Sequence, residues 1–239
     1  MLKILFNTQL MTINFIIYTC ILLVPIVTDS AFAKSMTDSM ASSSAAPNAQ
    51  NAEKQKIKEN SEIMMTMTIY NGNLVYPAPH WISDVKDLGN TKMFRDQTKN
   101  TFTFEQIPKN QAFEEWSTLY GVYGWHLPDY DFKRFIAESL NALALGCKEQ
   151  AKSKLVSAEG GSVVMTYHCA ALVDPLVKNG KDTESGFLYM SHVGSSYVKV
   201  YQAWRASNKD RGTPAWPIND ASITSAIERM KRITYTPRQ

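Results

Sequence analysis

The sequence predicts an α+β protein, with a single domain in which an antiparallel sheet is covered by helices. Segments with alternating apolar and polar residues, typical of half-buried strands, are separated at irregular intervals by segments with helical spacing. The regular strand–helix alternation of a parallel sheet is missing. We therefore expect one globular α+β domain over residues 61–239.

The first predicted strands lie on either side of a tight-turn signal at residues 71–72, which are Asn-Gly. Residues 65–69 alternate before this turn, and residues 74–76 continue as a second short strand. Residues 101–105 alternate again. A proline follows the second and third of these segments and ends them, since proline cannot donate to a strand ladder.

A helix is predicted after the strand over residues 101–105. Asn110 can cap it, and Glu114 and Glu115 would lie in its first turn, where the helix dipole favours negative charge. Gly121 and Gly124 would end it. Its apolar residues at helical spacing are Ala112, Phe113, Trp116, Leu119 and Tyr120.

Two further helices are predicted. One follows Asp131 and closes at Gly146, and the other is capped by Asn219 or Asp220 near the C-terminus. Three more segments alternate as strands, and the second and third of them are joined by a short hairpin loop. These strands cover residues 163–169, 186–192 and 197–204.

The first 33 residues are typical of a cleaved signal peptide. Lys3 supplies positive charge, residues 13–27 are apolar, and residues 31–33 (Ala-Phe-Ala) match the small-x-small cleavage pattern. An uncleaved anchor helix is the alternative, but the apolar run is shorter than the roughly 20 residues that span a bilayer. Residues 34–60 contain almost no aliphatic or aromatic side chains, which predicts a disordered linker. We expect an exported protein, periplasmic or secreted, that is not an integral membrane protein after cleavage.

Cleavage would remove Cys20 and leave two cysteines, Cys147 and Cys169. An even number of cysteines in an oxidising compartment favours a disulfide between them. Two free thiols are one alternative. A reactive cysteine beside His168 is another, although neighbouring residues on a strand point to opposite faces.

The composition excludes some kinds of function. A formal net charge of +3 is too small to indicate nucleic-acid binding. The histidines lack the spacing of a zinc site, and neither a phosphate-binding glycine loop nor a nucleophile elbow is present. The sequence therefore predicts no catalytic residues, cofactor or metal. If the protein were instead a secreted hydrolase with a scattered site, His126, Asp129 and Asp131 would be its acid–base residues.

An aromatic-rich segment is the strongest candidate for a binding site. Its members are Trp116, Tyr120, Tyr123, Trp125, His126 and Tyr130. They would lie between two predicted helices, either as part of the core or as a groove for a ligand or partner. Together with the export signal, this favours a non-enzymatic binding or accessory protein at the cell envelope or outside the cell. Its partner would be an unidentified protein or envelope component, and host interaction is one setting for it.

Several segments carry a resemblance to known families. The stretch from Thr103 to Trp116 resembles small exported bacterial proteins, and Tyr76-Pro77 with Trp81 is similar to the opening of the Mog1/PsbP-like α/β fold. Residues 186–205 resemble the central hairpin of that family. The resemblance extends over residues 63–233 and implies a binding or assembly module, and the sequence also resembles exported proteins of Legionella and its relatives. The stretch over residues 84–99 and the cysteine pair depart from a minimal member.

Overall fold

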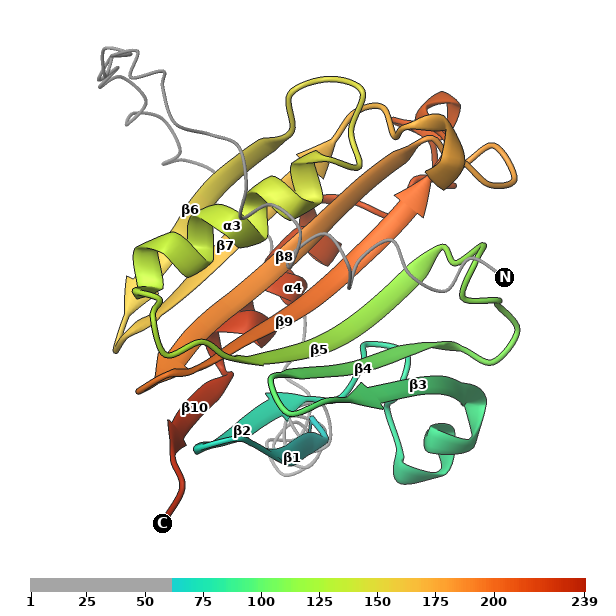
Figure 1. The fold of residues 1–239 in the computed structure, drawn as a ribbon. Helices are drawn as coiled ribbons and strands as arrows, with labels where there is room; N and C mark the ends of the chain where they lie inside the picture. Colours follow the sequence, from blue (N-terminus) through green and yellow to red (C-terminus); the bar gives the residue numbers. More distant parts are fainter. Residues whose placement is uncertain (1–61) are drawn as a thin grey trace, which may run out of the picture. The chain divides into compact units, whose positions relative to one another are not determined.

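The computed structural model describes residues 62–239. The predicted signal peptide and linker, at residues 1–33 and 34–60, lie outside the described residues. Residues 62–239 form a large seven-stranded sheet, a small three-stranded sheet and two α-helices (Figure 1). The fold is thus mostly antiparallel sheet with few helices.

The large sheet has the strand order β3-β4-β5-β9-β8-β7-β6, and each neighbouring pair is antiparallel. Its strands are β3 (Thr91–Gln97), β4 (Thr101–Pro108), β5 (Thr118–His126), β6 (Lys152–Glu159), β7 (Ser162–Cys169), β8 (Thr183–Val193) and β9 (Ser196–Ala206). The small sheet has the order β1-β2-β10 and consists of β1 (Met64–Ile69), β2 (Gly72–Pro77) and β10 (Thr234–Pro237). The helices are α3 (Phe132–Ala144) and α4 (Asp220–Lys231), with short 3-10 helices η1 (Val85–Asn90), η2 (Asp174–Leu176) and η3 (Asn208–Asp210).

The two faces of the large sheet are covered differently. Helix α4 and the small sheet pack against one face, which we call the α4 face, where Met230 and Leu74 are fully buried. Helix α3 packs against the other, the α3 face, through Phe135 and Leu143. In Figure 1, α3 lies over β6, β7 and β8, and neither α-helix lies over β3, β4 and β5 on this face. The α3 face is therefore covered by a helix on one half only.

The central hairpin and both helices confirm their predictions. Strands β8 and β9 pair from Thr183 to Val193, and nearly all their residues are buried because elements cover both faces. Asp131 caps α3, and its side chain accepts a hydrogen bond from the Arg134 backbone N–H at 2.7 Å. Of the two expected caps for α4, Asn219 is the one observed.

The helix predicted over residues 112–120 is wrong. The chain forms a loop until Ser117, because the Gln111 side chain accepts hydrogen bonds from the backbone N–H groups of Ser117 and Thr118. It then continues as β5, which pairs with β4 on one side and β9 on the other. Pairing on both sides satisfies the backbone without a helix. Gly121, expected to end the helix, instead lies under the Tyr123 ring, 2.5 Å from where a Cβ would be.

Three strands were not predicted, namely β3, β6 and β10. All three are at the edge of a sheet and are mostly exposed. An exposed edge strand needs no alternation of apolar and polar residues, so its sequence carries little periodic signal.

The predicted disulfide is present. Cys147 follows the end of α3, Cys169 ends β7, and their Cα atoms are 5.7 Å apart. The disulfide fastens α3 to the sheet, and neither a free thiol pair nor a reactive cysteine is formed. Within residues 62–239, no helix is both long and apolar enough to cross a membrane.

Candidate functional site

The six residues of the aromatic-rich segment do not share one surface. Strand β5 alternates, so Tyr120 points to the α4 face, where its ring stacks on Tyr76 with centroids 6.3 Å apart. Its neighbours Tyr123 and Trp125 pack on the α3 face. His126 lies beside the Tyr70 ring, while Trp116 and Tyr130 pack with the α3-face cluster. The groove between two helices is therefore not formed as expected, because one of those helices is a strand. That any of these residues binds a ligand stays a prediction.

Tyr123 and Trp125 form a compact group with a lysine on the α3 face. Their rings stack with centroids 6.2 Å apart and planes 23° apart. Lys199 on β9 is the direct cross-strand partner of Tyr123. Its Nζ lies 5.0 Å from the centroid of the Tyr123 ring and 5.4 Å from that of Trp125, within cation–π range. We call Glu105, Tyr123, Trp125 and Lys199 the aromatic–lysine site.

Glu105 on β4 completes this site. It accepts a hydrogen bond at 2.7 Å from the Tyr123 hydroxyl. Burial raises the pKa of the Glu105 carboxyl, and the Tyr123 hydrogen bond and the charge of Lys199 oppose that rise. Burial also lowers the pKa of Lys199 to about 8, against the attraction of Glu105. The site thus holds a lysine and a carboxylate whose charged forms are both disfavoured by burial.

A second polar group lies on the same face. Arg205 donates from Nε to Glu184 Oε2 at 2.7 Å, and the Tyr201 hydroxyl donates to Glu184 Oε1, also at 2.7 Å. The Arg205 guanidinium lies 4.1 Å from the centroid of the Trp116 ring. Both partners of the ion pair are nearly buried, with side-chain exposures of 11% for Arg205 and 8% for Glu184. This group fixes Trp116 against the sheet.

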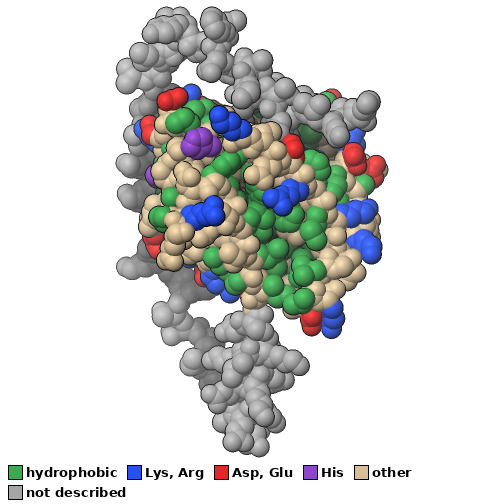
Figure 2. All heavy atoms as spheres, turned by 60° about the horizontal axis from the view of Figure 1, so that its bottom comes forward, with side chains coloured by type: hydrophobic (Ala, Val, Ile, Leu, Met, Phe, Trp, Pro, Cys, Tyr) green, Lys and Arg blue, Asp and Glu red, His purple; other side chains and the backbone are tan. Residues whose placement is uncertain are grey.

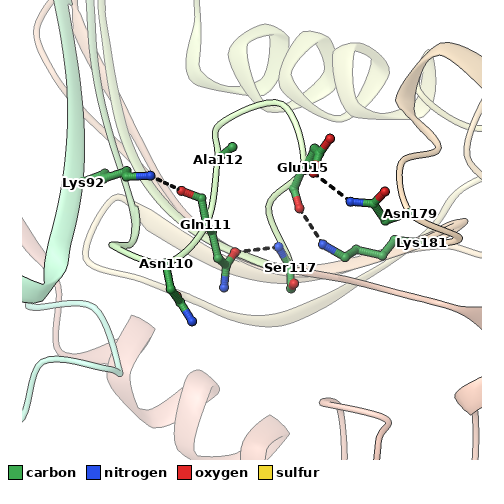
Figure 3. A pocket seen from close by; sticks show the side chains of 8 residues that line it. All are labelled: Lys92, Asn110, Gln111, Ala112, Glu115, Ser117, Asn179 and Lys181. Atoms are coloured by element: carbon green, nitrogen blue, oxygen red, sulfur yellow. Dashed lines mark hydrogen bonds between the residues drawn. The ribbon is translucent and has the colours of Figure 1, made fainter.

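A shallow pocket of 410 Å³ lies beside the loop that precedes β5 (Figure 3). Its lining residues are Lys92, Asn110, Gln111, Ala112, Glu115, Ser117, Asn179 and Lys181. Lys92 Nζ donates to the Gln111 carbonyl at 2.6 Å, and Lys181 Nζ donates to the Glu115 carbonyl. Asn179 Nδ2 donates to Glu115 Oε2 at 2.7 Å. Each lysine therefore uses one hydrogen bond to hold the loop, and the pocket is polar and open.

Two of the three residues named for a hydrolase site are engaged elsewhere. Asp131 caps α3, and His126 Nδ1 lies 3.2 Å from the hydroxyl oxygen of Ser195. Among residues 62–239, no hydrogen bond or ion pair joins His126 to Asp129 or Asp131. In the same part of the chain, no three His, Cys, Asp or Glu side chains are placed to hold a metal ion.

Sequence reasoning missed most of the polar residues on the α3 face, namely Glu105, Glu184, Lys199 and Arg205. One signal for Lys199 was available. The strand alternation over 197–204 places Lys199 on the same face as Tyr197 and Tyr201, which are both buried. A lysine within such an apolar row is uncommon and marks a position of interest.

Among solved structures, two of Mog1 proteins are similar to this chain. The Ran-binding protein Mog1p of Saccharomyces cerevisiae is 14% identical, with a TM-score of 0.41, and the match covers 73% of this chain and 96% of that one. A mutant of the protein Mog1 is 12% identical, with a TM-score of 0.42, over 73% of this chain and 97% of the other. Because both TM-scores are below 0.5, these likenesses assign neither a function nor a partner to this chain. No family model and no curated protein matches the sequence.

The lowered pKa of Lys199 predicts a pH dependence of stability. Between its folded pKa of about 8 and the unfolded value of about 10.4, the unfolded state binds more protons. Lys199 should therefore add about 1–2 kcal/mol to the free energy of unfolding from about pH 8 to about pH 9.5. Buried tyrosines with raised pKa values act in the opposite direction in this range, so the contribution is measured as the difference between wild type and Lys199→Met in urea unfolding at several pH values. This pH-dependent difference should be absent between wild type and Lys154→Met, whose lysine is exposed on β6. The same pH dependence of stability in both variants would contradict the assignment.

Proposed function

We propose that this protein is exported and acts as a non-enzymatic binding or accessory protein, at the cell envelope or outside the cell. Host interaction is one setting for this activity. The aromatic–lysine site on the α3 face is the proposed contact surface, and the partner is a protein or an envelope component. The observation that carries the proposal is the stacking of Tyr123 on Trp125, with Lys199 beside both rings, on β5, which neither α-helix covers on that face in Figure 1.

The chemistry of the site suits recognition of a partner with both apolar and polar groups. Tyrosine and tryptophan give a large contact area with few rotatable bonds, and they are enriched at the centres of interfaces. Trp125 is half-buried, and its ring packs edge-to-face on the Phe135 ring of α3, with centroids 5.3 Å apart. A rigid aromatic ring of this kind loses little entropy when a partner packs on it.

Replacement of Trp125 tests the proposal. The tagged full chain, with any processing the cell performs, is used to capture partners from periplasm and medium as wild type and as Trp125→Ala. We expect the recovered partner to bind the variant at least about tenfold more weakly, as for an interface anchor. Trp216→Ala is the matched control, because Trp216 lies in the loop before α4 with Arg211 over its ring.

Thermal unfolding of each variant separates binding from stability. If Trp125→Ala is folded and captures every partner as wild type does, the aromatic–lysine site is not the binding surface. A broad screen of esterase, peptidase and glycosidase substrates tests the non-enzymatic part of the proposal. Turnover that is abolished by Asp129→Asn would overturn it in favour of a hydrolase.

A further inference from the structure

The two edges of the large sheet are built differently. Strand β6 has an irregular register between Leu155 and Ser157. A bulge of this kind is a common means of keeping a sheet edge from pairing with another chain. Exposed basic residues do not distinguish the edges, because β3 carries Lys92 and Arg95 as β6 carries its lysines. Strand β3, at the opposite edge, pairs with β4 in continuous register over all seven of its residues and contains no proline. The β3 edge therefore lacks a bulge or a proline that would protect it.

Strand β3 is also exposed and partly apolar. It lies at the outer margin of the sheet in Figure 1, and six of its seven residues are exposed. Met93 is 51% exposed and Phe94 is 41% exposed. Figure 2 views the molecule from the side that carries β1, β2 and β3, and it shows hydrophobic side chains at the surface among a few lysines and arginines. An open edge of this kind is a template for adding another strand.

The hydrogen bonds at both ends of β3 determine which backbone groups point outward. Lys109 N–H donates to the Asn90 carbonyl and Thr98 N–H donates to the Thr101 carbonyl, both at 2.8 Å. In an antiparallel pair, residues alternate between exchanging hydrogen bonds with the partner strand and pointing away from it. The even-numbered residues of β3 therefore face β4. The groups that point to the open edge are the N–H and carbonyl groups of Met93, Arg95 and Gln97 and the carbonyl of Thr91, whose N–H donates to the Leu88 carbonyl at the end of η1.

We propose that two copies of this chain associate through β3, with the two strands antiparallel and Phe94 of one copy opposite Phe94 of the other. In this register, Thr91 lies opposite Gln97 and Met93 lies opposite Arg95. These are the residues whose backbone groups point outward, so all of those groups except the Thr91 N–H form hydrogen bonds between the copies. The two large sheets become one continuous sheet.

The side chains on the α3 face match in the same register. Lys92 lies opposite Asp96 of the second copy, and the two-fold symmetry forms this contact twice. Lys92, Phe94 and Asp96 occupy positions that exchange no hydrogen bonds between the copies, where facing side chains approach most closely. The interface thus has a central aromatic pair with a pair of opposite charges on each side.

Neighbouring registers fit less well. A shift of two residues in one direction places Arg95 opposite Arg95 of the second copy, and like charges directly opposite are destabilising. A shift in the other direction places Lys92 opposite Phe94 and leaves Gln97 without a partner.

The charges of Lys92 and Asp96 are also available for a contact between copies, because neither residue forms an ion pair within residues 62–239. Lys92 uses one N–H donor for the Gln111 carbonyl and keeps two more.

Exchange of the two charges tests the proposed dimer. The full chain, with any processing the cell performs, is studied by sedimentation equilibrium over a concentration series. Wild type should show a monomer–dimer equilibrium. Lys92→Asp and Asp96→Lys each place like charges opposite each other twice, so each should raise the dimer Kd by about tenfold or more. The double variant with both substitutions restores opposite charges and should return the Kd close to the wild-type value.

A matched control uses the other edge. Lys154→Asp makes the same change of charge on β6 and should leave the dimer Kd unchanged. Circular dichroism and thermal unfolding check that every variant keeps its fold, which we expect because the altered side chains are exposed and Lys92→Asp removes a single exposed hydrogen bond to the loop. The proposal is overturned if wild type stays monomeric at all concentrations. It is also overturned if the single variants dimerise as wild type does, or if the double variant fails to recover.

Discussion

Replacing Glu184 with alanine should lower the free energy of unfolding by about 3–5 kcal/mol. The substitution leaves the Arg205 guanidinium nearly buried without its carboxylate, because only 11% of that side chain is exposed. It also removes the acceptor of the Tyr201 hydroxyl. A buried charge without a partner costs far more than an exposed one. Since native domains are stable by about 5–15 kcal/mol, urea unfolding should show a large loss.

Two further variants, each with a smaller expected loss of stability, serve as comparisons for Glu184→Ala. Tyr201→Phe removes one hydrogen bond but leaves the ion pair, and it should cost about 1 kcal/mol. Glu228→Ala removes the partner of Lys231 in an exposed ion pair and should cost less than about 1 kcal/mol. If Glu184→Ala is no more destabilising than Glu228→Ala, the buried pair does not hold the α3 face together.

Loss of the disulfide should be the second large effect. The double variant Cys147→Ala/Cys169→Ala should be less stable than the oxidised wild type by about 3 kcal/mol. The bond links residues 22 positions apart, so it restricts a sizeable loop of the unfolded chain. It also joins the end of α3 to β7. Urea unfolding of both proteins under oxidising conditions measures the difference.

Reduction provides the internal control for the disulfide. A thiol reductant should lower the stability of wild type towards that of the double variant and leave the double variant unchanged. Alkylation followed by mass mapping reports whether the two cysteines were paired at the start. Wild type that is equally stable with and without reductant would contradict the prediction.

The sequence patterns that predicted elements correctly belong to segments that bury apolar residues, on one face of α3 and on both faces of β8 and β9. Helix α3 has an aspartate cap and an apolar stripe that includes Phe135 and Leu143, so its 3.6-residue period is clear. The β8–β9 hairpin was found because its turn separates two long alternating segments. The pattern failed at β5 and the loop before it, where Trp116, Leu119 and Tyr120 have helical spacing by coincidence. There, pairing with β4 and β9 decides the structure, and local spacing does not report it.

The candidate site was predicted in part only. Tyr123 and Trp125 were named from their aromatic character, and both lie on the α3 face. Glu105 and Lys199 come from β4 and β9, and they meet Tyr123 only through the register of three strands. A register of this kind is set by the whole sheet, so it could not be inferred from one segment.

The strand order also governs how much of the chain must exist before the large sheet can close. Strand β9 is the only link between β3-β4-β5 and β8-β7-β6 in the large sheet of residues 62–239. A growing chain that has not reached Ser196 holds two half-sheets, and β5 and β8 each expose an unpaired edge. The small sheet can be completed only later in synthesis, because β10 at residues 234–237 supplies its third strand. Folding of residues 62–239 can therefore finish only after residues 234–237 are synthesised, and until β9 is synthesised the unpaired edges of β5 and β8 are open to premature contacts between nascent chains.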